Sequence, residues 1–269
     1  ITGTSAIVAV HDAIRLGRID VGIAGGVESM SNTAILVSPA LAGALRDSRA
    51  AKGPMDQLKL LARLRPGDLL PQLPGVEEPS TGLTMGQHTE LMVKEWKIPR
   101  LIQDEIAFRS HRNAHAATED GRLGAEIHPL GGLDRDSMVR ADTSLEKLAK
   151  LKPVFDPEQG TLTAGNSSPL TDGAAVVLLM SEERATKEGR TPLAFVKDFE
   201  HAAIDPADGL LMAPGVAVPR LLRRHGLSLA DMDVVEVHEA FGGQVACNLA
   251  AWEKGWKEPA IGTIPVERL

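Results

Sequence analysis

The chain has 269 residues, of which 43% are apolar and 24% charged, and its net charge is −7. This composition is typical of a globular protein with one large or two modest hydrophobic cores. The negative charge argues against broad nucleic-acid binding. The single cysteine, Cys247, excludes an internal disulfide and a cysteine-based zinc cluster. Because no apolar run approaches the roughly 18 residues of a membrane span and no signal peptide is recognisable, we expect a cytoplasmic or mitochondrial-matrix location.

The first 32 residues predict a helix followed by a strand. Apolar residues recur at helical spacing in residues 4–17, and Gly17 stands where a helix should end. Residues 19–26 form a short, β-branched run that stops at two glycines, a pattern typical of a buried strand. A helix followed by a strand indicates an α/β layer.

Residues 33–155 have a different character, because proline and glycine are frequent and strand patterns disappear. Two amphipathic stretches predict helices here, at residues 55–64 and 104–121. His111 and His115 have the four-residue spacing of a two-histidine metal site, with Glu119 one turn further. No second group of ligands accompanies them, so we interpret this side of the helix as a solvated face.

The α/β pattern returns at residues 156–190. A strand predicted over residues 174–180 leads through Ser181, a good N-cap, into a helix that ends near Gly189. A second α/β unit begins at about residue 191. It contains a predicted strand, a predicted helix and a strand that runs into a helix, at residues 193–203, 214–226 and 233–252.

His238 and Glu239 stand where the last predicted strand gives way to its helix. In open α/β sheets, ligand sites form at the carboxyl ends of strands, beside the N-termini of helices. Gly242 and Gly243 follow closely and permit a close approach of backbone or ligand. The pattern alone leaves two readings equally open, a functional site or a histidine that simply caps a strand.

Four segments together resemble motifs of the thiolases. They are DVGIAGGVESMSN at residues 20–32, STGLTMG at 80–86, the stretch from LAKLKPVFDPEQG to GNSSPLTDGAA at 148–175, and HEAFGGQ at 238–244. With His at its first position, the last segment is similar to the thiolase subunit of the fatty-acid β-oxidation trifunctional complex. Several motifs in register over the whole chain are far more specific than one short match.

The resemblance implies a fold and a domain division. The fold would be an α/β/α/β/α layered sandwich of two similar halves, with a mostly helical loop domain inserted at residues 33–155. Residues 1–32 and 156–190 would belong to the N-terminal half, and residues 191–269 would start the C-terminal half. Homodimers and homotetramers are usual in the family.

The resemblance also implies the activity of a 3-ketoacyl-CoA thiolase, in which a cysteine takes the acyl group, acetyl-CoA leaves, and coenzyme A accepts the acyl group. Coenzyme A is a substrate here, and neither a bound cofactor nor a metal is expected. The nucleophilic cysteine would fall just before Ile1, and the Gly-His-Pro histidine and second cysteine beyond Leu269. Because both ends also lie inside unfinished elements, we interpret the chain as a fragment. The alternatives are a biosynthetic acetoacetyl-CoA thiolase and a non-catalytic acyl-CoA binding or scaffold protein.

By the same resemblance, His238 stabilises the thioester enolate oxygen, and Glu239 fixes the loop by hydrogen bonding. The other positions implied to contact substrate are Met85 at the acyl pocket, Ala164 and Ser168 along the pantetheine arm, Phe155 above that arm, Phe241 beside the substrate, and Arg140 near the nucleotide end. Three alternatives remain open. Met85 can be a plain core residue, Arg140 can be one half of an exposed ion pair, and the loop TAGNSSPL at residues 163–170 can be an ordinary polar turn. Cys247, inside the last helix, is expected to be a packed core thiol.

An insertion at residues 36–75 resembles the one that distinguishes the trifunctional-type thiolases. It carries an apolar stripe with positive charges nearby, formed by Met55, Leu58, Leu61 and Leu64 with Lys59, Arg63 and Arg65. A stripe of this kind can pack onto its own domain. Alternatively, it can dock a hydratase/dehydrogenase subunit or an anionic membrane surface.

Overall fold

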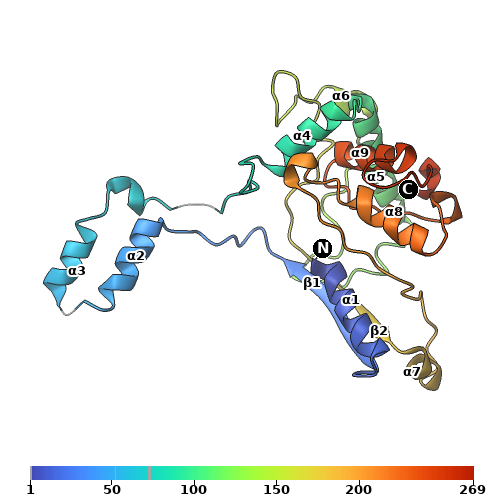
Figure 1. The fold of residues 1–269 in the computed structure, drawn as a ribbon, viewed down its shortest axis with the longest axis horizontal. Helices are drawn as coiled ribbons and strands as arrows, with labels where there is room; N and C mark the ends of the chain where they lie inside the picture. The colour runs from blue at the N-terminus through green and yellow to red at the C-terminus, as the bar shows by residue number, and fades with distance from the viewer. Residues whose placement is uncertain (1, 52, 72–73) are drawn as a thin grey trace. The chain divides into compact units, whose positions relative to one another are not determined.

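The computed structural model describes residues 2–51, 53–71 and 74–269 (Figure 1). The prediction that the chain begins inside a helix at Ile1 falls outside the described residues, and so do three positions of the insertion at 36–75. In the part of the chain that the structure describes, no helix is both long and apolar enough to cross a membrane.

Two compact units divide the chain, and each is built from two separate stretches. The first contains Ile1–Val76 and Leu170–Phe195, and the second contains Glu77–Pro169 and Val196–Leu269. The division runs through the segment 33–155, which the family resemblance treats as one loop domain. The domain boundaries drawn from that resemblance therefore stay a prediction.

An antiparallel pair of strands forms the sheet of the first unit. β1 (Val21–Glu28) pairs along its whole length with β2 (Gly173–Met180), so that Val21 lies opposite Met180. α1 (Thr2–Arg15) packs on both strands. Both strands and the helix lie close to where the sequence predicts them, but β1, predicted to be a buried strand, is mostly exposed.

The ends of two helices in this unit follow the predicted signals. Gly17, just after α1, has a φ of +66°, a conformation that L side chains rarely adopt, and this confirms it as the end of the helix. Ser181 caps α7 (Glu182–Lys187), because its hydroxyl accepts a hydrogen bond from the Arg184 N–H at 3.2 Å. Local signals of this kind are reliable because they need no distant partner.

A small helical group completes the first unit. α2 (Pro39–Ser48) packs on α3 (Pro54–Leu61) and on the short 3₁₀ helix η1 (Pro66–Leu69). The Ser38 hydroxyl joins two of these helices, because it accepts from the Leu41 N–H at the start of α2 and donates to the carbonyl of Asp68 in η1.

α9 (Gly242–Lys254) forms the centre of the second unit. It packs against α4 (Met85–Glu95), α5 (Arg100–Glu119) and α8 (Pro214–Arg224), which surround it in Figure 1. α6 (Leu145–Ala149) packs on α5. Three 3₁₀ helices lie in the connections, η2 (Pro206–Asp208), η3 (Leu229–Asp231) and η4 (Val266–Arg268). The most deeply buried apolar side chains include Met92, Leu162, Met212, Val245, Cys247 and Trp252.

The strands predicted at residues 193–203 and 233–238 are not formed in the described part of the chain. Their β-branched, apolar pattern favours an extended backbone, but a strand also needs a neighbour for its N–H and C=O groups. Phe195 and Val234 are exposed. The Val235 N–H donates to the carbonyl of Arg268, which is a single contact and not a ladder.

Candidate functional site

Two segments far apart in the sequence meet in the second unit. The Ser168 N–H donates to the carbonyl of Ala240 at 2.9 Å, and the Gly242 N–H donates to the carbonyl of Asn166 at 2.9 Å. Between these bonds, Ser167 and Phe241 form an isolated antiparallel bridge. The structure thus joins residues 163–168, which contain the predicted pantetheine contacts Ala164 and Ser168, to the segment of the His-Glu-Ala-Phe motif, residues 238–242.

Two aromatic rings lie beside this junction. Phe155 and Phe241 pack edge to face, with ring centroids 5.8 Å apart and an interplanar angle of 85°. Gly86, at the start of α4, lies against the Phe155 ring so closely that a Cβ there would come within 2.3 Å of it. Met85, the residue before, is about half exposed. Two predicted positions, Phe155 and Phe241, are thereby brought together, and a third, Met85, is next in sequence to the glycine that lies against Phe155.

Part of the junction faces solvent. His238, Ala164 and Ser168 are exposed, whereas Asn166 and Phe241 are buried. Within the described residues, the His238 ring makes no hydrogen bond to another side chain or to the backbone. An exposed imidazole can donate a hydrogen bond to a ligand oxygen, which is the chemistry of an oxyanion hole.

Buried side chains of the loop itself and of α5 fix the backbone of the loop by hydrogen bonds. Asn166 is almost fully buried, and its amide nitrogen donates to the Asp104 carboxylate at 2.9 Å. Its amide oxygen accepts from the Thr163 N–H at 2.8 Å. The Asp104 carboxylate also accepts from the Arg100 guanidinium Nε, at 2.8 and 2.9 Å to its two oxygens. Neither Arg100 nor Asp104 was among the predicted site residues; the signal for them in the sequence is their i,i+4 spacing on α5.

Glu90, on α4, supports the beginning of the same loop. Its carboxylate is buried and accepts hydrogen bonds from the N–H groups of Thr161 and Leu162, the shortest of which are 2.8 and 2.7 Å. A Cβ at Gly160 would come within 2.6 Å of this carboxylate, so the turn before the loop requires glycine. This support was also missed, because a Glu on an amphipathic helix normally faces solvent.

Comparison with known protein families shows which family the chain belongs to. The model of the thiolase N-terminal domain matches residues 1–183, and the model of the thiolase C-terminal domain matches residues 190–258. The chain belongs to the thiolase family. Two curated relatives are each named 3-ketoacyl-CoA thiolase. The one from Colwellia psychrerythraea is 42% identical over 99% of this chain and 64% of its own length. The one from Klebsiella pneumoniae is 44% identical over 92% of this chain and 58% of its own.

Solved thiolase structures confirm the α/β thiolase-like fold class. An acetyl-CoA acetyltransferase of Bacillus anthracis matches 96% of this chain with a TM-score of 0.76 and 32% identity. A dimeric peroxisomal thiolase of Saccharomyces cerevisiae matches 99% with a TM-score of 0.73 and 26% identity. The chain spans 61% and 60% of these two proteins, and thus about three fifths of the thiolases it resembles.

Arg140 lies beside a histidine of α5. Its backbone N–H donates to Nδ1 of His111 at 3.3 Å, so the ring proton of the neutral histidine is on Nε2. Burial lowers the pKa of His111, and the Arg140 guanidinium lowers it further, while the carboxylates of Glu239 and Asp136 oppose the shift. The carboxylate of Glu239, in the His-Glu-Ala-Phe motif, therefore lies close enough to α5 to affect the pKa of His111.

These contacts correct two expectations. His111 is partly buried and hydrogen-bonded, so its side of α5 is not the solvated face that we predicted, whereas the His115 side chain is 43% exposed. Glu239, expected to fix the loop by hydrogen bonding, accepts no hydrogen bond from any other residue that the structure describes. No group of three or more His, Cys, Asp and Glu residues within those described ranges could hold a metal ion.

Cys247 is a core thiol, as predicted. It is fully buried in α9, and burial raises its pKa to about 12, with a smaller contribution from the carboxylate of Glu95. A nucleophilic cysteine needs its thiolate near neutral pH. Cys247 therefore does not supply the nucleophile of a thiolase reaction.

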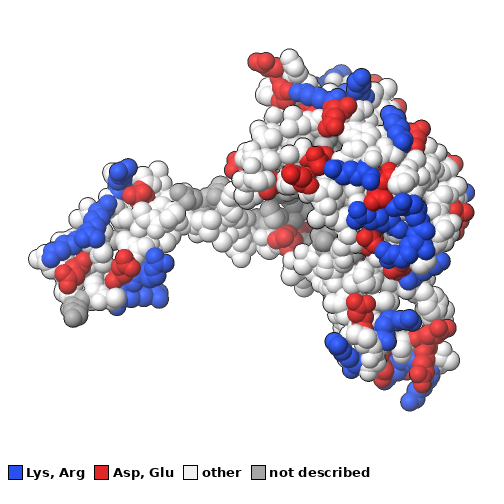
Figure 2. Space-filling view, viewed as in Figure 1, with Lys and Arg blue, Asp and Glu red and all other residues white. Residues whose placement is uncertain are grey.

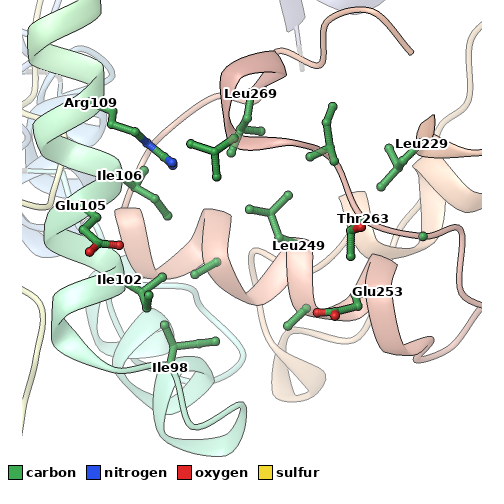
Figure 3. A pocket seen from close by; sticks show the side chains of 15 residues that line it. Ile98, Ile102, Glu105, Ile106, Arg109, Leu229, Leu249, Glu253, Thr263 and Leu269 are labelled. Carbon is green, nitrogen blue, oxygen red and sulfur yellow. The ribbon is translucent and has the colours of Figure 1, made fainter. Parts of the chain in front are cut away.

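Two further features of the second unit are separate from this junction. A cavity of about 310 Å³ lies between α5, α9 and the last residues of the chain (Figure 3), and none of the candidate site residues lines it. Positive side chains gather over α8 (Figure 2). They are paired with carboxylates: Arg220 and Arg223 with Glu258, and Arg224 with Asp198 and Glu200. This cluster therefore offers little uncompensated charge to an anion.

Proposed function

We propose that the chain carries the coenzyme A-binding and oxyanion-stabilising part of a 3-ketoacyl-CoA thiolase. The observation that carries the proposal is the pairing of residues 163–168 with residues 238–242, which joins the segment of the exposed His238 to a loop in which Ala164 and Ser168 are exposed. Bacterial relatives named 3-ketoacyl-CoA thiolase, at 42% and 44% identity, supply the substrate class. We place the protein in the cytoplasm of a bacterium, with the mitochondrial matrix as the alternative.

In this proposal, the pantetheine arm lies along Ala164 and Ser168, and Phe155 covers it. A cysteine thiolate attacks the 3-keto carbon, and the bond between C2 and C3 breaks. The electron pair remains on the acetyl thioester as an enolate, whose oxygen accepts a hydrogen bond from His238 until C2 is reprotonated. The acyl-enzyme then passes its acyl group to the thiol of a second coenzyme A.

Replacement of His238 tests this role. In the thiolase that contains this chain, His238→Ala should lower kcat by roughly 10²-fold or more and leave coenzyme A affinity nearly unchanged, as the loss of an oxyanion donor does. Steady-state thiolysis and calorimetric titration with coenzyme A measure the two quantities. An unchanged kcat removes His238 from the site.

The 269 residues alone should bind coenzyme A without thiolytic turnover, because Cys247 is not a usable nucleophile and the resemblance puts the reactive cysteine before Ile1. Turnover by these residues alone would contradict that placement. Turnover of long-chain 3-ketoacyl-CoA by the full enzyme separates degradation from a biosynthetic acetoacetyl-CoA thiolase. Coenzyme A binding by the full enzyme without any turnover favours a binding or scaffold protein.

A partner of the first unit is part of the proposal. Three side chains of the predicted apolar stripe, Met55, Leu58 and Leu61, are exposed on α3 at 65%, 61% and 47%. We propose that this face docks a hydratase/dehydrogenase subunit, with an anionic membrane as the alternative, and that the enzyme is a homodimer or homotetramer. Leu58→Glu with Leu61→Glu should abolish co-purification or liposome flotation without changing the oligomer. Unfolding of that variant with no partner found would assign the stripe to the core.

A further inference from the structure

A buried carboxylate on α5 is hydrogen-bonded to the junction between residues 163–168 and 238–242. Asp104 is 2% exposed, and both of its oxygens accept hydrogen bonds from the Arg100 guanidinium. One oxygen also accepts from the Asn166 amide at 2.9 Å. A buried carboxylate is strongly destabilising unless such partners satisfy it. Asp104 therefore fixes where Asn166 lies.

Asn166 is in turn hydrogen-bonded to other residues of the loop, so its position fixes theirs. Its side chain uses its donors on Asp104 and on the carbonyl of Thr161 at 3.2 Å, and its acceptor on the Thr163 N–H. Its own carbonyl accepts the Gly242 N–H at the start of α9. An unbroken chain of hydrogen bonds thus runs from Asp104 through Asn166 to Gly242, across both partners of the junction.

Arg100 secures the other side of the same loop. Its guanidinium donates to the carbonyl of Leu148 at 2.7 Å. Leu148 and Leu151 in turn press on Gly165, where a Cβ would come within 2.5 Å of each side chain. The Arg100–Asp104 pair therefore holds the loop both through Asn166 and through the residues on which Gly165 rests.

We propose that Asp104 is a positioning residue for coenzyme A binding: it holds residues 163–168 and 238–242 as one rigid piece without touching the ligand. The ligand named here, coenzyme A, rests on the proposed function. The role of Asp104 in holding the two segments together does not rest on it. The pantetheine arm should depend on Asp104, whereas the nucleotide end, assigned to Arg140 on another segment, should not.

The test compares Asp104→Ala with Asp104→Asn in the full chain. Two ligands are titrated, coenzyme A and its nucleotide part, 3′-phospho-ADP. For Asp104→Ala, the Kd for coenzyme A should rise about tenfold, the effect of losing a hydrogen bond to a charged group, and the Kd for 3′-phospho-ADP should not change. Asp104→Asn keeps an acceptor for Asn166 and should restore most of the affinity. Lys257→Met removes an ion pair to Asp208 whose lysine is 42% exposed, and should change neither Kd.

Hydrogen exchange gives a readout without ligand. In Asp104→Ala, the amides of Ser168 and Gly242 should exchange about tenfold faster, because the junction opens more often. The amide of Leu229, bonded to the carbonyl of Ile261, should keep its rate. Should Asp104→Ala fail to fold, Asn166→Ala breaks the same chain while leaving Asp104 paired with Arg100, and the same results are expected.

Equal weakening of both ligands, a uniform rise in exchange over the second unit, or unchanged exchange at Ser168 and Gly242 would each overturn the positioning role. If the unsubstituted chain binds no coenzyme A, the proposed function and the ligand named here both fail. The exchange result then decides alone whether Asp104 positions the two segments.

Discussion

The β1–β2 pair and the loop at residues 163–168 are held in place by different groups. The strands satisfy each other's backbone through a regular ladder, and side chains such as Val27 and Val176 are exposed at 80% and 73%. The loop has only isolated bridges, such as that to Phe241, and buried side chains support the rest of its backbone: Asn166 accepts from the Thr163 N–H, and Glu90 accepts from the Leu162 N–H just before the loop. Regular structure leaves residue identity free, whereas an irregular loop at a site ties its shape to particular side chains from neighbouring helices.

The largest expected effect separates the buried core of the second unit from the exposed strands of the first. Trp252 is 1% exposed, and its Nε1–H donates to the carbonyl of Pro214. Trp252→Ala should destabilise the second unit by about 3–5 kcal/mol, through a cavity and an unpaired carbonyl. Leu178→Ala, in β2, should cost much less, because Leu178 is 57% exposed. Urea denaturation measures both, and equal costs would remove the distinction.

A smaller effect is expected from adding one methyl group to either region. Gly242→Ala should cost about 1–3 kcal/mol, because its Cβ would come within 2.5 Å of the backbone oxygen of Gln103. Gly26→Ala, in β1, meets nothing closer than 3.9 Å and should be close to neutral. The difference in urea midpoints checks this pair. A neutral Gly242→Ala would show that the backbone of Gln103 in α5 can move away from α9 at little cost in stability.

The smallest expected effect is a pH dependence confined to the second unit. The pKa of Cys247 is raised from 9.0 to about 12 in the folded protein, so its stabilising contribution is complete below pH 9 and is lost as the pH rises towards 12. The free energy of unfolding should fall by about 1 kcal/mol between pH 9 and pH 10. Cys247→Ala should remove this slope in urea titrations. A slope that survives the substitution belongs to other groups.

The sequence predicted elements whose signals are local. The positions of β1 and β2, the Gly17 end of α1 and the Ser181 cap follow from periodicity and from residues that act on their own backbone. The strands expected at 193–203 and 233–238 failed because an apolar pattern predicts an extended backbone and says nothing about a neighbour.

The candidate site was predictable in its parts, because family resemblance named the loop and the His-Glu-Ala-Phe segment. Their contact depends on bonds such as that from Ser168 to Ala240, which join distant positions of the chain. The supports of the loop could not be predicted. A carboxylate on a helix, such as Glu90 or Asp104, normally faces solvent, and only the packed structure shows that it is buried and committed.

The pairing of β1 with β2 also sets an order of events during synthesis. The whole of residues 29–172 lies between the two strands, and this stretch includes α4 and α5 of the second unit. β1 must therefore wait with an open edge while the ribosome makes its partner, and α4 and α5 must wait longer for α9. Late closure of so many residues slows folding, and an unpaired edge can recruit other chains. Both units therefore stay incomplete until β2 and α9 have been made, and a chaperone has the most exposed surface to bind before that point.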